Sequence, residues 1–79
     1  MNRTELESQV LDMVAMAYKK DRASLSMETS FKDDLGGASV QMVGLVSEIE
    51  NELDVVLMLA DASGCATVGA LVDLIESEM

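Results

Sequence analysis

Apolar residues recur at helical spacing in three separate stretches of the 79-residue chain. An apolar residue at every third or fourth position places a stripe of a helix against a core, whereas a half-buried strand needs alternation, and no stretch sustains alternation. The chain also has no proline and only two aromatic residues, Tyr18 and Phe31. The pattern therefore predicts an all-α fold.

The periodicity predicts three longer helices and one short helix, which comes third. Their expected ranges are 5–18, 40–53, 59–63 and 68–77. The expected buried stripes are Leu6, Val10, Met13, Val14 and Ala17 in the first helix, Met42, Leu45, Val46, Ile49 and Leu53 in the second, and Val68, Leu71, Val72 and Ile75 in the last. Gly64 is a natural C-cap for the short helix, and Thr67 suits the N-cap of the helix after it.

The start of the first helix has two possible capping registers. Thr4 with Glu7 fits a capping box, and Asn2 with Glu5 fits one two residues earlier. Both pairs have the spacing that lets the two residues satisfy each other's backbone N–H groups, so both registers stay open.

Two connections complete the predicted fold. Residues 21–38 form a long, mostly irregular loop with apolar residues that pin it to the bundle, namely Leu25, Met27, Phe31 and Leu35. Residues 54–59 are apolar enough to be largely buried. We therefore expect one domain over residues 1–79, a small four-helix bundle with a long loop between the first two helices.

The net charge of −10 lies entirely in the second part of the chain. None of the five basic residues lies beyond Lys32, and ten acidic residues follow from Asp33 onward. Such a surface repels nucleic acids and anionic membranes and attracts basic patches on proteins. The alternative is a solvated surface without any partner.

Two residue types limit the chemistry. The chain has no histidine, which excludes His-based metal sites and His general-base catalysis. Cys65 is the only cysteine, so it forms no internal disulfide, and we expect a small core residue rather than a nucleophile. With no visible signal peptide and no apolar run long enough to span a bilayer, we expect a cytoplasmic protein. We also expect this protein to be a monomer.

The stretch from Asp33 to Val40 leads directly into the second predicted helix. Gly36 and Gly37 indicate a tight bend, and Ser39 then stands at or next to a helix N-cap. A plain capping role explains the serine, and so does a hydroxyl presented near the positive end of the helix. The adjacent Asp33 and Asp34 could bind a divalent cation weakly, but their spacing does not match a calcium loop.

One face of the second helix is smooth and only weakly polar. It is made of small or short side chains flanked by two longer polar ones, namely Val40, Gly44, Ser47 and Asn51 with Gln41 and Glu48. This face suits docking by a partner, and it equally suits an ordinary exposed helix face.

The stretch Asp34-Leu35-Gly36-Gly37-Ala38-Ser39-Val40 resembles the Asp-Leu-Gly-x-Asp-Ser-Leu signature of acyl carrier proteins. The similarity extends over essentially the whole chain. Phe31 falls at the family's aromatic position before the motif, Glu50–Asp54 resembles the acidic end of its second helix, and Thr67-Val68 matches the opening of its last helix.

The resemblance implies a carrier that is not an enzyme. Ser39 would bear a 4′-phosphopantetheine arm, attached by a separate phosphopantetheinyl transferase that uses coenzyme A, and the arm's thiol would hold acyl groups as thioesters. Its partners would be acyl-transferring or condensing enzymes with basic docking patches, in fatty-acid, polyketide or a related specialised lipid pathway. By the same resemblance, an acyl chain would enter an interior lined by Met42, Val46, Ile49, Leu57, Leu71 and Val72.

Three departures from the family pattern indicate a specialised member. Ala38 stands where the motif has aspartate, and Val40 replaces its leucine. The usually acidic outer face of the second helix has Gln41, Gly44 and Ser47 instead. Lost charges at a steered interface slow association and change partner choice. An alternative function is an adaptor with the carrier fold that never receives the arm and acts by protein–protein binding.

Overall fold

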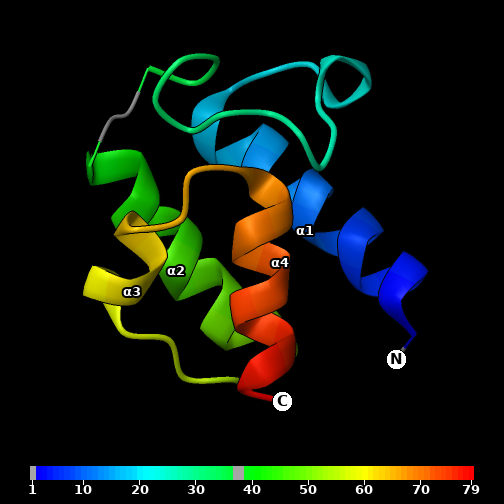
Figure 1. Ribbon diagram of the computed structural model, residues 1–79, viewed down its shortest axis with the longest axis vertical. Helices are drawn as coiled ribbons and strands as arrows, with labels where there is room; N and C mark the ends of the chain where they lie inside the picture. Colours follow the sequence, from blue (N-terminus) through cyan, green and yellow to red (C-terminus); the bar gives the residue numbers. More distant parts are fainter. Residues whose placement is uncertain (1, 37–38) are drawn as a thin grey trace.

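The computed structural model describes residues 2–36 and 39–79, and these form a bundle of helices (Figure 1). The helices are α1 (Arg3–Tyr18), α2 (Ser39–Leu53), α3 (Leu59–Ser63) and α4 (Val68–Ser77), with a single 3-10 turn, η1 (Arg22–Ser24), after α1. Within the described residues there is no strand, only an isolated bridge between Ser30 and Thr67. The prediction of an all-α four-helix bundle is confirmed.

The N-terminus of α1 uses the earlier of the two capping registers. The Asn2 side chain accepts a hydrogen bond from the Glu5 backbone N–H at 2.8 Å and donates one to the Glu5 carboxylate at 2.9 Å. The Thr4 register is therefore wrong, and α1 begins two residues before the predicted start. The helix ends at Tyr18, and its C-cap, Lys19, has a φ of 55° in the left-handed region.

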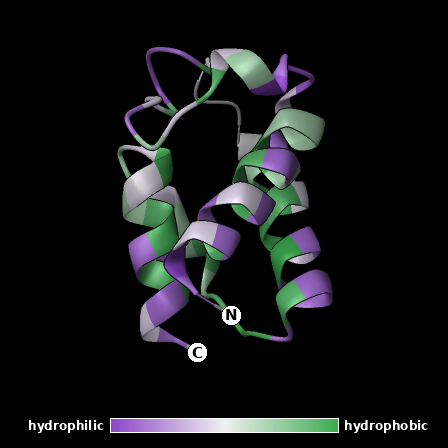
Figure 2. Cartoon of the chain, turned by 90° about the vertical axis from the view of Figure 1, so that its right-hand side faces the viewer, coloured by the Kyte–Doolittle hydropathy of each residue, from purple (hydrophilic) through white to green (hydrophobic). Residues whose placement is uncertain are grey.

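The core lies between the helices, with α1 packed against α2 and α4, and α3 also packed against α2 and α4. The green, apolar sides of the helices face one another in Figure 2. The predicted stripes are buried except at two positions, Ala17 and Leu53, which are only partly buried. Both lie in the last turn of their helix.

The long loop after α1 is fastened to the start of α4 by backbone hydrogen bonds. Gly69 donates to the Met27 carbonyl at 2.8 Å, Val68 donates to Thr29 at 3.0 Å, and Phe31 donates to the Ala66 carbonyl at 3.0 Å. The predicted apolar anchors of this loop are buried at Leu25, Phe31 and Leu35, while Met27 is only partly buried. The loop thus lies across one end of the bundle and leads the chain to α2 (Figure 1).

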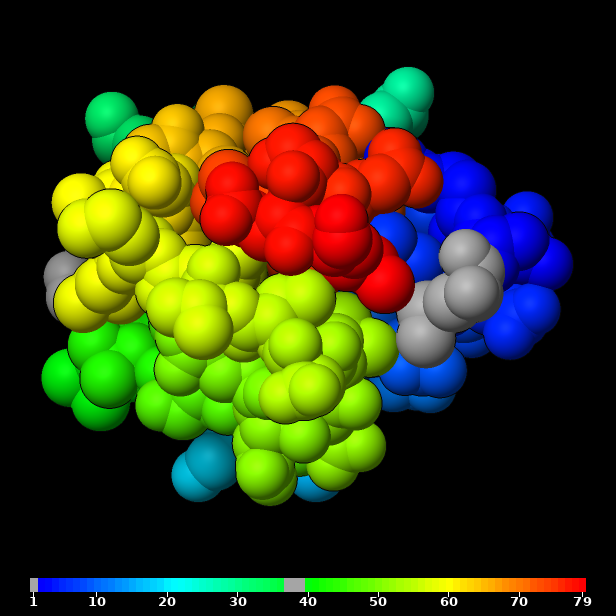
Figure 3. Space-filling view, turned by 90° about the horizontal axis from the view of Figure 1, so that it is seen from below, coloured from blue at the N-terminus to red at the C-terminus, as the bar shows by residue number. Residues whose placement is uncertain are grey.

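The connection between α2 and α3 corrects the prediction that residues 54–59 are largely buried. Val55 and Leu57 are buried, but Val56, Met58 and Leu59 are exposed. The physical reason is that successive side chains of the extended segment from Val55 to Met58 point to opposite sides, so only every second one reaches the core. Leu59 is already the first residue of α3 and lies on the exposed side of that helix. These residues, α3 and the C-terminus share the face shown in Figure 3.

The helix α2 begins at Ser39, one residue before the predicted start, and the other predicted helix ends are confirmed. Gly64 is the C-cap of α3, and Thr67 is the N-cap of α4, with its hydroxyl oxygen accepting from the Ala70 N–H at 3.1 Å. Among the described residues, no helix combines the length and the apolar character that a membrane span requires.

Candidate functional site

Ser39 is the first residue of α2. A helix N-terminus offers free backbone N–H groups and the positive end of the helix dipole, and both favour an anionic group. Gly36 has φ of +82°, as the predicted bend requires. The rest of that bend, at Gly37, and the conformation of the Ser39 side chain lie outside the described part of the structure.

The acidic residues before the bend hold the loop in shape. The Asp34 carboxylate accepts a hydrogen bond from the Ser30 backbone N–H at 2.8 Å, and the Ser30 hydroxyl accepts one from the Asp33 N–H at 3.0 Å. Asp34 therefore has a local structural role at the base of the turn. In residues 2–36 and 39–79, no three His, Cys, Asp or Glu side chains gather into a group that could hold a metal ion.

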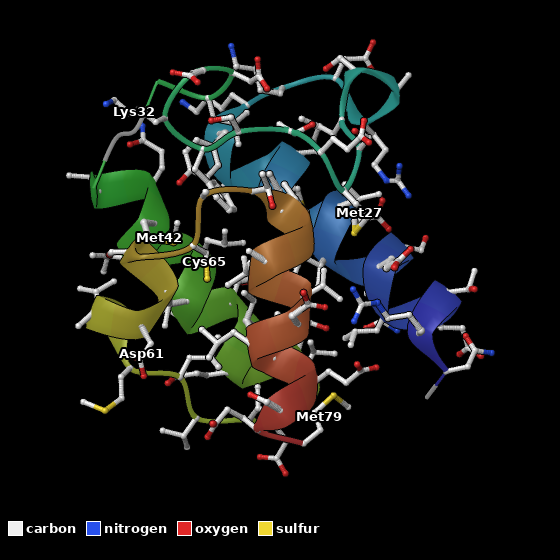
Figure 4. All side chains as sticks on the ribbon, in the orientation of Figure 1. Met27, Lys32, Met42, Asp61, Cys65 and Met79 are labelled. Carbon is white, nitrogen blue, oxygen red and sulfur yellow. The ribbon has the colours of Figure 1, made fainter. Side chains whose placement is uncertain are left out.

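An open hollow of about 610 Å³ lies between the long loop, the first turns of α2 and the α3–α4 connection. Its walls include Tyr18, Phe31, Lys32, Met42 and Cys65. Figure 4 shows Met42 and Cys65 close together, with Lys32 on the loop above them. The rings of Tyr18 and Phe31 pack at 5.9 Å between centroids and form one side of the hollow. The hollow therefore has mainly apolar walls, and both a cation, Lys32, and an anion, Asp33, line it.

Two titratable groups in this hollow are held in their neutral forms. Burial raises the pKa of the Tyr18 phenol. Burial also raises the pKa of the Cys65 thiol, and the negative charges of Asp61 and Asp73 raise it further. Cys65 packs against the core but is only partly buried, so the prediction of a core residue holds only in part.

The six residues expected to line an acyl-binding interior all lie in the packed core. Met42, Val46, Ile49, Leu57, Leu71 and Val72 each expose 7% of their surface or less. Of these six, only Met42 also borders the open hollow. Sequence reasoning missed Tyr18, Lys32 and Ala66 as residues of the hollow, because they come from three separate segments and no local pattern connects them.

The predicted partner face of α2 is accessible. Val40, Gly44, Ser47 and Asn51 are exposed, while Gln41 and Glu48 are half-buried. Val40 exposes 80% of its surface, although it is apolar. The structure thus places the six residues on the open side of α2.

A small acidic helical bundle with a serine at the N-terminus of its second long helix is the architecture of a carrier domain. Residues 8–75 match the family model described as phosphopantetheine attachment site. The chain is 34% identical over 79 residues to an acyl carrier protein of Exiguobacterium sp., with both chains covered completely. It is 33% identical over 75 residues to the acyl carrier protein of Chlorobium phaeovibrioides, covering 95% of this chain and 96% of that one. The chain belongs to the acyl carrier protein family.

Membership of this family defines the general activity. The chain has a phosphopantetheine attachment domain, whose prosthetic group is covalently bound 4′-phosphopantetheine. It is a carrier and not an enzyme. Members of the family are modified by a phosphopantetheinyl transferase and interact with enzymes of acyl metabolism.

Proposed function

We propose that Ser39 is the attachment point of the phosphopantetheine arm and that the chain carries acyl groups as thioesters on the arm's thiol. The observation that carries this proposal is the position of Ser39 at the first residue of α2, three residues after Gly36, whose φ is +82°. A phosphodiester at this position is an anion at a helix N-terminus, where backbone N–H groups and the dipole stabilise it.

The fastening of the preceding loop supports the same proposal. Its backbone hydrogen bonds to α4 and its buried anchor Phe31 fix one side of the bend. The loop is therefore held in place ahead of Gly36, three residues before Ser39, and this favours recognition of the site by a transferase. The open hollow beside the first turns of α2 is a place where part of an arm or its cargo can lie.

The proposed partner surface is the exposed side of α2, made of Val40, Gln41, Gly44, Ser47, Glu48 and Asn51. Its partners are acyl-transferring or condensing enzymes with basic docking patches. Because Ala38, Gln41 and Gly44 remove charge or side chains from this region, we propose a dedicated fatty-acid, polyketide or related specialised lipid pathway. We further propose that residues 1–79 form a single carrier domain that works as a cytoplasmic monomer.

Intact-mass spectrometry tests the attachment site. The unmodified chain is incubated with coenzyme A and a broad-specificity phosphopantetheinyl transferase. We expect a gain of one phosphopantetheine in the native chain, no gain in Ser39→Ala, and an unchanged gain in Ser77→Ala, which removes an exposed serine at the C-terminal end of α4, outside the proposed partner surface. A chain that gains no mass with several transferases would contradict the proposal.

A second candidate function, an unmodified adaptor, is favoured by one residue. Ala38 removes the carboxylate that the family motif places beside the serine. The adaptor predicts that Ser39→Ala leaves partner binding intact and lowers the free energy of unfolding by only about 1 kcal/mol, as for a lost cap. The carrier predicts that Ala38→Asp speeds loading of Ser39, because the added charge attracts a basic transferase.

A further inference from the structure

We propose that the groove between α1 and α2 docks a basic amphipathic helix of a partner protein. Met16 of α1 and Val40 of α2 expose 77% and 80% of their surfaces. Both line a single open hollow of about 370 Å³, in which Met13, Ala17 and Gly44 are also wall residues. Two large exposed apolar side chains beside one depression form a surface that a partner's apolar residue would cover.

Gly44 leaves its part of the groove wall without a side chain. A Cβ atom built on Gly44 has no atom within 4 Å outside its own helix, so the space above its backbone is open. Val40, Gly44, Glu48 and Glu52 follow one another at intervals of four residues and form a single stripe along α2. The groove therefore runs along the helix and is not confined to one turn.

The far end of the groove is acidic. A second hollow of about 340 Å³ continues from the first and shares Met13, Met16 and Glu48 with it. Its other wall residues are Gln9, Asp12 and Glu52. The Asp12 carboxylate is paired with Arg22 at 2.8 Å, whereas within the described residues Glu48 and Glu52 have no ion pair.

This combination of apolar and acidic ends selects the occupant. A helix fits when an apolar side chain lies between Met16 and Val40 and a Lys or Arg, about two turns away, meets Glu48 and Glu52. A second copy of this chain is disfavoured because each copy carries a net charge of −10. The inference rests on the proposed function and extends its partner surface from one helix face to a site that includes α1.

An NMR titration of the full, isotope-labelled chain tests the proposal. The probe is a synthetic amphipathic peptide helix with a leucine stripe flanked by lysines, and the control peptide has glutamates in place of the lysines. We expect amide shifts along the groove at Met16, Val40, Gly44 and Glu48 with the lysine peptide, weakened by added salt, and none with the glutamate peptide. Shifts centred on Val56, Met58 and Leu59, or no shifts at saturating peptide, would overturn the proposal.

Matched variants separate the groove from general surface effects. Met16→Gln should weaken peptide binding about tenfold, as expected for an apolar anchor. Met58→Gln, at another exposed methionine that lies outside the groove, should leave binding within about twofold. Glu48→Gln should weaken binding and reduce its salt dependence, and Glu28→Gln, an exposed glutamate in the long loop, should not. Equal effects of the groove variants and their controls would overturn the proposal.

The titration is also done on Ser39→Ala, which cannot carry the arm. If this variant still binds the lysine peptide, the result supports docking in the groove independently of loading with the arm. A chain that is never loaded but binds the peptide in the groove contradicts the proposed function alone. A chain that is loaded but binds no peptide contradicts the groove alone.

Discussion

The α-carbon of Gly69 lies directly against the backbone of Met27. The Gly69 N–H donates to the Met27 carbonyl at 2.8 Å, and a Cβ atom added to Gly69 would lie 3.0 Å from the same oxygen. The first turn of α4 and the long loop are thus packed as closely as a residue without a side chain allows. This contact helps to fix the distance between α4 and the long loop that precedes Ser39.

Gly69→Ala should lower the free energy of unfolding by about 1 kcal/mol, because the crowding of a fixed carbonyl exceeds the gain in helix propensity. Gly44→Ala is the matched control, since its Cβ meets open space, and it should raise the free energy of unfolding by up to about 1 kcal/mol. Urea titrations of both variants measure the effect. Stabilisation by both substitutions would show that the loop yields to the added methyl group.

The N-cap of α4 should contribute about 1 kcal/mol to the free energy of unfolding. Thr67→Ala removes the oxygen that accepts from the Ala70 N–H, and Thr67→Ser retains it. We expect Thr67→Ala to lower the midpoint of thermal unfolding and Thr67→Ser to restore most of the loss. Equal melting temperatures of the two variants would argue against a stabilising N-cap hydrogen bond from Thr67.

Alkaline pH should destabilise the fold. The pKa values of Tyr18 and Cys65 are raised in the folded chain, so the folded state holds these protons more tightly than the unfolded state. The resulting stabilisation is complete below the unfolded cysteine pKa of about 8.5 and is lost as pH rises through the folded values. Thermal melts across this range should show the decline, and a Tyr18→Phe, Cys65→Ala variant should show less of it.

Added salt should stabilise the chain because it screens the excess of negative charge. Arg3 offsets part of that repulsion, since its guanidinium pairs with Glu7 and Asp73 at 2.8 Å each and with Glu76 at 3.1 Å. Arg3→Gln should therefore lower the melting temperature at low salt and increase the recovery produced by NaCl or magnesium. A melting temperature that does not depend on salt in either protein would contradict this.

Local signals in the sequence predicted the ends of α3 and α4 because Gly64 and Thr67 act on their immediate neighbours. The start of α1 was predicted two residues late, since two overlapping capping pairs fit and only one forms. Burial of residues 54–59 was overestimated, because apolar composition does not reveal which side chains of an extended segment face the core. Such errors arise where the outcome depends on contacts between distant segments.

The same distinction applies to the site. The sequence motif predicts Ser39 as the attachment point, which stays a prediction, and helical periodicity was sufficient to place Val40, Gly44 and Ser47 on an exposed side of α2. The hollow between Tyr18, Lys32 and Cys65 and the groove beside Met16 could not be predicted. Both are formed by segments that meet only in the folded chain. Helical spacing predicts only that Met16 lies outside the buried stripe of α1.

Fragmentation mass spectrometry of the chain isolated from its native host is the most direct test of the central claim. After proteolysis, the peptide that contains residues 33–47 should carry one phosphopantetheine, alone or acylated, and the fragment ions should assign it to Ser39 rather than Ser47. The acyl group found on the arm would also identify the cargo. An unmodified Ser39 in protein isolated from cells that load other carriers, or an arm on a different serine, would contradict the assignment.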